Sequence, residues 1–216
     1  MDTAVAAMAF VQNCDALVFD LRRNGGGSPG MVNFLSSHFF AEPTHLNSLW
    51  FRESDSTQDF WSLPGVPGVQ RPEVPIVVLT SGDTFSGAEE FAYSLQALGR
   101  ATLVGARTRG GAHPGRHIAL GGPFGVFMPT GKAINPVTGT NWEGRGVIPD
   151  VEVPAEQALE RALTDLRPLA ARFGAARLDR RLSEWGEAGE IDATVRDGEA
   201  PVRKNAPRDP EPDRVP

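Results

Sequence analysis

The feature that most constrains the fold is an apolar run, VPIVVLT (residues 74–80), followed by the turn SGDTFS (81–86) and by GAEEFAYSLQALG (87–99). A short, continuous apolar run suits a strand that is buried on both faces, as in a parallel sheet. The segment after the turn has the composition and apolar spacing of a helix. The order therefore predicts a strand–turn–helix unit of an α/β fold, with Ser86 at the start of the helix.

Two interpretations of Ser86 follow from this position. Unpaired N–H groups and the helix dipole favour developing negative charge at a helix N-terminus, which suits a serine nucleophile that attacks a carbonyl group. Serine is also a preferred N-cap residue, and Glu89 three positions later completes a capping-box spacing. Taken alone, the motif favours the cap.

The other elements are predicted from periodicity and from turn residues. Segment 41–73 is rich in Pro, Ser and aromatic residues, and we expect an irregular lid or rim there, because such long loops tend to be functional. A globular core is expected over residues 1–175 and a C-terminal extension over 176–216, disordered from about residue 187 because it is charged and Pro-rich. The expected elements are helices over 3–12, 31–40, 87–98 and 155–172, strands over 15–21, 74–80, 101–104 and 151–153, short strands at 49–52 and 60–63, and antiparallel ribbons over 116–136 with a turn at Gly121 and Gly122.

Composition narrows the function classes. The 216 residues suffice for an enzyme core, and the net charge of −6 comes from interspersed charges without a basic stripe, so nucleic-acid binding is not expected. No apolar stretch reaches the roughly 18 residues of a membrane span, and the N-terminus lacks the basic region of a signal peptide. The compartment stays open. Cys14 is the only cysteine, which excludes a disulfide within the chain, and its place before an apolar run favours a buried thiol.

A glycine loop follows the first predicted strand, in RRNGGG (residues 22–27). Parallel strands place ligands beyond their carboxyl ends, so this loop and the Ser86 turn are expected to lie together if the two strands are neighbours. Glycines let the backbone approach a ligand and present N–H groups, as in an oxyanion hole. A flexible connection is the alternative, and the phosphate-loop patterns GxxxxGK[ST] and GxGxxG are absent.

Four blocks in this order resemble the catalytic domain of the carboxy-terminal processing (tail-specific) serine peptidases, over roughly residues 5–165. The blocks are ALVFDLRRNGGGSPG, VVLTSGDTFSGAEEFA, LVGARTRGGAHPG and NWEGRGVIPDVEV. The similar branch is the one with the tricorn protease core and the interphotoreceptor retinoid-binding protein repeats. The resemblance implies a crotonase/ClpP-like α/β fold, a largely parallel mixed sheet with flanking helices and antiparallel β ribbons. It also implies Ser86 as nucleophile, with oxyanion donors on the N–H groups of Gly87 and of Gly25 or Gly26.

The general base is the open part of this prediction. The lysine base of the processing branch corresponds to Gly111, and the only lysines, Lys132 and Lys204, lie in a predicted turn and in the tail. The tricorn-like branch uses serine, histidine and glutamate, which places Glu143 as the acid that orients or stabilises the base. Its histidine comes from upstream of the first strand, a part that this chain does not include.

His113 is the internal candidate for the base, because it lies in the loop that bears the lysine in related enzymes. The alternatives are a loop histidine bonded to a backbone carbonyl and, for Glu143, a solvated loop acid. Asp150, Asp20 and Arg22 are expected to serve the structure, and Trp142 to pack in the core or over the site. The other histidines, His38, His45 and His117, are weaker candidates.

Three hypotheses result. The first is a serine endopeptidase that forms an acyl-enzyme at Ser86, without metal or cofactor, on an extended polypeptide bound by strand addition. The second is a catalytically incompetent domain of the same fold that binds a small apolar ligand or a peptide. The third is a fragment that lacks its general base. A homo-oligomer is compatible with all three.

Overall fold

The computed structural model describes residues 1–187, with side chains through residue 184. The chain divides into two units, Met1–Phe173 and Gly174–Pro216. In the second unit the described residues, 174–187, are helical, and the disorder predicted after about residue 187 lies outside the described residues.

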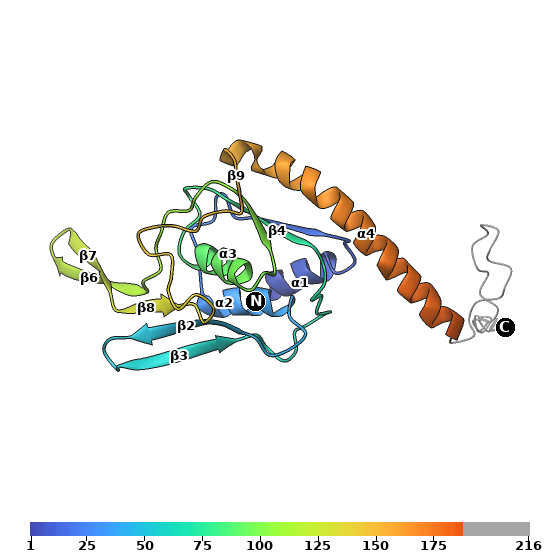
Figure 1. The fold of residues 1–216 in the computed structure, drawn as a ribbon. Coiled ribbons are helices and arrows are strands. Elements are labelled where there is room, and N and C mark those ends of the chain that lie inside the picture. Colours follow the sequence, from blue (N-terminus) through green and yellow to red (C-terminus); the bar gives the residue numbers. More distant parts are fainter. Residues whose placement is uncertain (188–216) are drawn as a thin grey trace, which may run out of the picture. The chain divides into compact units, whose positions relative to one another are not determined.

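A parallel sheet forms the centre of the first unit (Figure 1). Its strands are β1 (Leu17–Asp20), β4 (Ile76–Thr80), β5 (Thr102–Gly105) and β9 (Val151–Glu152), in the order β1-β4-β5-β9. All five residues of β4 are buried, as its apolar run predicts. The expectation that the first strand is buried on both faces was only partly right, because β1 lies at the sheet edge and Val18 and Phe19 stay partly exposed.

Helices pack on both faces of this sheet. One face holds the larger core, in which Phe91 and Leu95 of α3 (Gly87–Ala97) join Val78 of β4 and Leu103 of β5, together with residues of α1 (Asp2–Phe10) and α2 (Pro29–Ser37). The other face packs against the 3₁₀ turn Ala155–Gln157 and α4 (Ala158–Glu187). There Ala158, Ala162 and Leu166 contact Val77, Leu79 and Val104.

The segment expected to be an irregular lid is mostly a β hairpin, whose two strands overlap the short strands predicted at 49–52 and 60–63 but are longer. Strands β2 (His45–Phe51) and β3 (Ser56–Trp61) pair with each other, and β2 also pairs with β8 (Gly131–Ile134). The sequence obscured this because β3 is largely exposed and polar, so it lacks the apolar alternation of a half-buried strand. Lys132, predicted in a turn, lies in β8.

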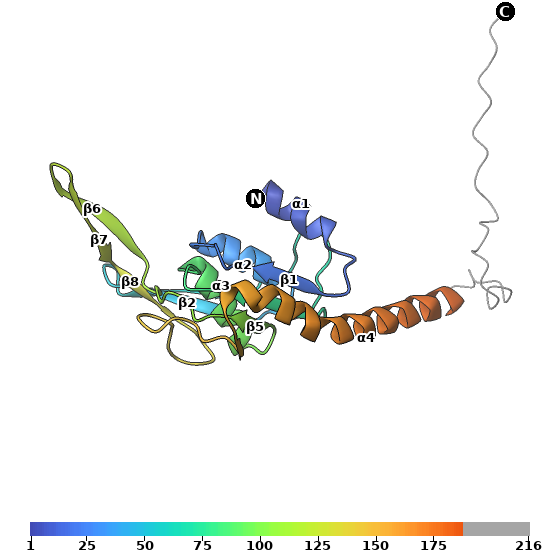
Figure 2. The same ribbon diagram turned by 90° about the horizontal axis from the view of Figure 1, so that it is seen from above.

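The predicted ribbon is confirmed as β6 (Gly115–Gly121) and β7 (Phe124–Pro129). Gly121 and Gly122 form its turn, with φ of 102° and 57°. Figure 2 shows this ribbon extending away from the central sheet. Most of its residues are exposed, including Phe124 and Leu120.

The structure also bears on Cys14 and on helix length. The Cys14 thiol is exposed, so the prediction of a buried thiol was wrong: it follows α1 in a surface turn, one step before the chain enters the sheet. Among the described residues, no helix combines the length and apolar character needed to span a bilayer.

Candidate active site

Ser86 occupies a strained turn at the end of the loop between β4 and α3. Its φ of 55° and ψ of −124° are outside the regions that L-residues ordinarily adopt. Asp55 is the only other non-glycine residue with positive φ in the described part of the chain. Such conformations cost about 1–3 kcal/mol and persist where the surrounding structure imposes them, frequently at functional sites.

A buried carboxylate holds this turn in place. The Glu89 side chain is fully buried and accepts the Ser86 N–H at 2.8 Å, which confirms the predicted capping contact. The same carboxylate accepts the N–H groups of Gly110 (2.6 Å) and Gly111 (2.9 Å) and the hydroxyl of Thr108 (2.5 Å). Glu89 therefore joins the Ser86 turn to the loop at 108–111, a role that the local capping pattern does not reveal.

The glycine loop packs directly on the Ser86 turn, as expected for neighbouring parallel strands. Gly26 has φ of 103°, and a Cβ there would lie 2.8 Å from both the Ser86 Cβ and the Gly87 nitrogen. Only glycine fits this approach. The contact brings the two predicted sources of oxyanion donors together.

Some backbone N–H groups in this region already donate a hydrogen bond, whereas others do not. The Gly26 N–H donates to Asn24 Oδ1 at 2.9 Å, and the Asn24 carbonyl accepts the Phe85 N–H at 3.1 Å. Within residues 1–187, the N–H groups of Gly25 and Gly87 donate no hydrogen bond. Gly25 and Gly87 are thus the predicted donors that remain available.

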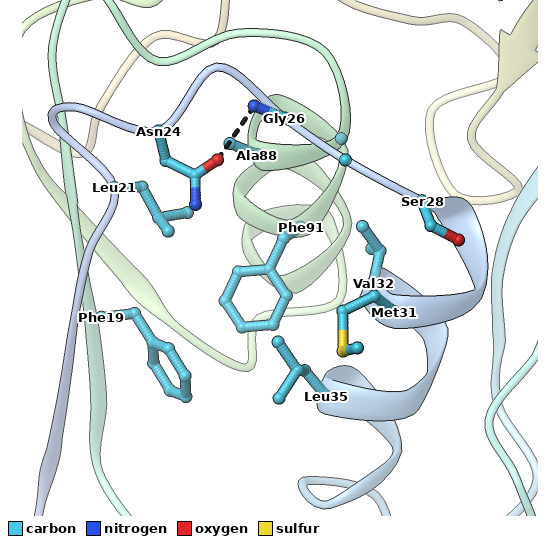
Figure 3. Close-up of a pocket in the computed structure, with 12 residues that line it drawn as sticks. Phe19, Leu21, Asn24, Gly26, Ser28, Met31, Val32, Leu35, Ala88 and Phe91 are labelled. Atoms are coloured by element: carbon cyan, nitrogen blue, oxygen red, sulfur yellow. Dashed lines mark hydrogen bonds between the residues drawn. The ribbon is translucent and has the colours of Figure 1, made fainter. Parts of the chain in front are cut away.

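An apolar cavity of about 110 Å³ opens beside Gly26, Gly27 and Gly87 (Figure 3). Phe19 and Leu21 from β1 and its following turn, Met31 and Leu35 from α2, and Phe91 from α3 surround it. The backbone of the glycine loop and of the first residues of α3 completes the lining. Sequence analysis missed this cavity, because its walls come from three elements that meet only in the fold.

The position expected to bear a lysine in related enzymes is closed by an aromatic ring. A Cβ on Gly111 would lie 2.2 Å from Phe85 Cε2, far inside van der Waals contact. Arg109 covers the Phe85 ring at 5.3 Å, and Trp142, buried as expected for a core residue, donates to the Gly111 carbonyl at 3.1 Å. A side chain at position 111 would need Phe85 to move.

The structure brings Glu143 and His113 together. Glu143 Oε2 accepts the N–H groups of Ala112 (2.6 Å) and His113 (3.1 Å) and lies 3.8 Å from His113 Nδ1. The His113 side chain is 34% exposed and the Glu143 side chain 40%. No hydrogen bond joins the His113 ring to the Ser86 hydroxyl among the described residues.

The other acidic candidates bond to the scaffold. Asp20 pairs with Arg22 at 2.6 Å, and this contact lowers the pKa of the Asp20 carboxyl and raises that of the Arg22 guanidinium. Asp150 accepts the Leu103 N–H at 2.7 Å and the Gln96 amide at 2.9 Å, which holds β5 and α3 to the final loop.

The remaining histidines have structural neighbours: His38 is buried against Phe34, His45 stacks on Trp61, and His117 contacts Phe127. Among described residues, no three His, Cys, Asp or Glu side chains gather in a metal-binding arrangement.

Comparison with known proteins covers the part of the chain that contains the four blocks. The sequence profile of peptidase family S41 matches residues 1–153. The chain belongs to peptidase family S41. Its membership confirms the predicted resemblance to the carboxy-terminal processing peptidases.

Individual relatives support the same assignment. A carboxy-terminal-processing protease of Bartonella bacilliformis is 29% identical over 136 residues, which cover 63% of this chain but only 30% of that protein. The photosystem II D1 C-terminal processing protease aligns with a TM-score of 0.57 at 24% identity, over 72% of this chain and 39% of that one. A putative S41 protease from Bacteroides fragilis aligns with a TM-score of 0.66 at 19% identity, over 78% and 49%. These structures confirm the predicted fold class.

Proposed function

We propose that this S41 domain is a serine endopeptidase that forms an acyl-enzyme at Ser86. The observation that supports it most is the strained Ser86 turn, with the unoccupied N–H of Gly87 directly after the serine and that of Gly25 in the adjoining loop. A hydroxyl at a helix N-terminus beside free N–H donors suits attack on a carbonyl whose oxygen becomes negative.

The reaction proceeds in two steps. The Ser86 hydroxyl loses its proton to a base while its oxygen bonds to the peptide carbonyl carbon, and the base then protonates the leaving amine as the C–N bond breaks. Water next attacks the ester carbonyl carbon while the same base accepts its proton. The base then returns this proton to the Ser86 oxygen as the ester C–O bond breaks, which releases the carboxylate product and restores Ser86. The N–H groups of Gly87 and Gly25 stabilise the oxyanion in both steps.

For the base we propose His113, with Glu143 stabilising its imidazolium form. The support is their contact at 3.8 Å and the link from this loop through Gly111 and Glu89 to the Ser86 N–H. Both side chains are partly exposed, so the imidazole has room to turn toward the Ser86 hydroxyl when substrate binds.

The apolar cavity supports a polypeptide substrate. At about 110 Å³, lined by Phe19, Leu35 and Phe91, it suits one medium-sized apolar side chain next to the scissile bond. We propose that substrates are cleaved beside residues such as valine or leucine.

A second candidate function is a binding domain without hydrolysis. The Phe85 ring at the position where related enzymes bear the lysine favours it, since that base has no room here. In that case the apolar cavity would hold a ligand or peptide side chain, and Ser86 would serve only as the helix cap.

Labelling with a fluorophosphonate probe separates the two candidates. The probe is applied from pH 6 to 9 to the unmodified protein and to the Ser86→Ala, His113→Ala and His117→Ala variants, with peptide mapping of the label. We expect labelling at Ser86 that disappears in Ser86→Ala, slows at least about 100-fold in His113→Ala and stays unchanged in the matched control His117→Ala. Absence of Ser86-dependent labelling at every pH would contradict the enzyme and leave the binding domain.

A further inference from the structure

A second hollow, distinct from the apolar cavity, lies between the β2–β8 pair and the base of the β6–β7 ribbon. Its volume is about 790 Å³, against about 110 Å³ for the apolar cavity. We call it the cationic groove, because Arg52, Arg116 and Lys132 line it and Glu53 is its only acidic residue. A groove of this size is large enough for several residues of an extended peptide rather than for one side chain.

The lining of the groove is positively charged, whereas the chain as a whole is negatively charged. The protein has a net charge of −6, whereas this groove has three cations and one carboxylate. The carboxylate hardly neutralises it, because Glu53 lies 3.9 Å from Arg116 and both side chains are exposed, where an ion pair contributes little. Lys132 lies 5.5 Å from the Trp50 ring centre, a contact that leaves its charge intact.

Arg52 is the cation with the fewest local contacts. Its backbone N–H donates to the Thr130 carbonyl at 2.9 Å, but among the described residues its guanidinium forms no ion pair or hydrogen bond. A planar guanidinium that faces a groove without a partner suits bidentate pairing with a carboxylate.

The groove adjoins the proposed catalytic centre. His113 lines it, and the Pro114 carbonyl accepts the N–H groups of Thr130 (2.9 Å) and Gly131 (3.2 Å), so the loop at 112–114 forms one of its walls. The same loop contacts Glu143 and, through Gly111, the carboxylate of Glu89 that holds the Ser86 turn. A polypeptide bound at Ser86 would reach the groove by continuing past His113.

We propose that the cationic groove binds a carboxylate-bearing segment of a polypeptide substrate next to the scissile bond. Arg52, Arg116 and Lys132 pair with its carboxylates, which come either from Asp and Glu side chains or from the terminal α-carboxylate. The proposal rests on the proposed function in taking the substrate to be a polypeptide, but binding in the groove requires no hydrolysis.

The test measures binding by fluorescence anisotropy in the Ser86→Ala background, which prevents cleavage. Three labelled peptides of equal length are compared: an acidic peptide with an amidated end, a neutral peptide with a free α-carboxylate, and a neutral amidated peptide. The variant is Arg52→Glu/Lys132→Glu, and the matched control Arg167→Glu/Arg172→Glu makes the same charge change on exposed residues of α4. Thermal unfolding of each protein verifies that it is folded.

We expect a carboxylate-bearing peptide to bind at least 10-fold more tightly than the neutral amidated one. This preference should disappear in Arg52→Glu/Lys132→Glu, persist within twofold in the control and weaken as salt is raised. The peptide that binds better identifies the source of the carboxylate. Equal binding of all three peptides would overturn the proposal, as would equal binding of a single-stranded oligonucleotide of the same charge.

The outcome is separable from that of the proposed function. Groove-dependent binding without probe labelling at Ser86 would retain the groove and reject the peptidase. Labelling at Ser86, combined with peptide binding that is unchanged in Arg52→Glu/Lys132→Glu, would retain the peptidase and reject the groove.

Discussion

The two halves of the candidate site differ in how firmly they are held. Around Ser86, a fully buried carboxylate accepts four hydrogen bonds and the glycine loop packs within van der Waals contact of the turn. Around His113, one half-exposed carboxylate accepts two N–H groups and the ring nitrogen lies 3.8 Å from it. In the proposed mechanism, the nucleophile and its oxyanion donors are therefore preorganised, whereas the base is positioned by substrate.

The largest effect is expected from Glu89→Ala, which removes the acceptor on which the rigid half depends. Three partly buried N–H groups and one hydroxyl would lose their partner, and we expect the free energy of unfolding to fall by about 3–5 kcal/mol. Urea unfolding measures it. A loss below about 1 kcal/mol would mean that the Ser86 turn does not depend on Glu89, and the contrast between the halves would no longer hold.

The pH dependence of stability tests the buried half of the site, through Glu90 next to Glu89. Burial raises the pKa of Glu90 to about 7 from its ordinary 4.5, so between these values the folded protein retains a proton that the unfolded chain releases. The contribution of Glu90 to the free energy of unfolding is therefore fully present below about pH 4.5. It is lost as pH rises through 7, by about 3 kcal/mol in total.

Glu90→Gln should remove this pH dependence and make the protein more stable than the unmodified chain at pH 8. Urea unfolding at pH 5 and pH 8 provides the comparison, with the exposed Glu160→Gln as control. The same pH slope in both variants would show that Glu90 is not the responsible group.

Gly111→Ala tests the junction between the halves. The added methyl group meets the Phe85 ring, and overpacking of this kind costs about 1–3 kcal/mol. Phe85→Ala removes the ring, so the cost of Gly111→Ala should shrink in that background. A double-mutant cycle in urea measures the coupling, and additive effects would mean that the ring does not close this position.

The smallest change in stability is expected from Glu143→Gln, in the loosely held half. The side-chain carbonyl oxygen of the glutamine can still accept the N–H groups of Ala112 and His113, so the free energy of unfolding should change by less than about 1 kcal/mol. Probe labelling of Ser86 should nevertheless slow about 10-fold or more, because the imidazolium of His113 loses its counter-charge. Unchanged labelling would remove Glu143 from the proposed mechanism.

The sequence was sufficient for the parts of the fold that local patterns determine. The apolar run of β4, the capping pair Ser86–Glu89 and the Gly121–Gly122 turn each follow from residues close in the chain. It was insufficient for the full extent of β3, which is largely exposed and polar and lacks apolar alternation, and for Cys14, whose exposure depends on where a short turn meets the surface.

The candidate site likewise has features that the sequence predicts and features that it does not. That Gly26 meets Ser86 was predictable, because parallel strands end at the same sheet edge. The bonds of Glu89 to the 108–111 loop, the Phe85 ring over Gly111 and the cationic groove were not, because each depends on residues that approach one another only in three dimensions. The catalytic roles of Ser86, Gly25, Gly26, Gly87, His113 and Glu143 stay predictions.

The backbone angle at Ser86 has an evolutionary consequence. Glycine adopts this conformation without strain and costs only a few tenths of a kcal/mol as an N-cap, so Ser86→Gly should fold at least as well as the serine form. A gene copy released from selection for hydrolysis would therefore drift to glycine here without a folding penalty. Selection for chemistry, and not for stability, is what would keep a serine at this position.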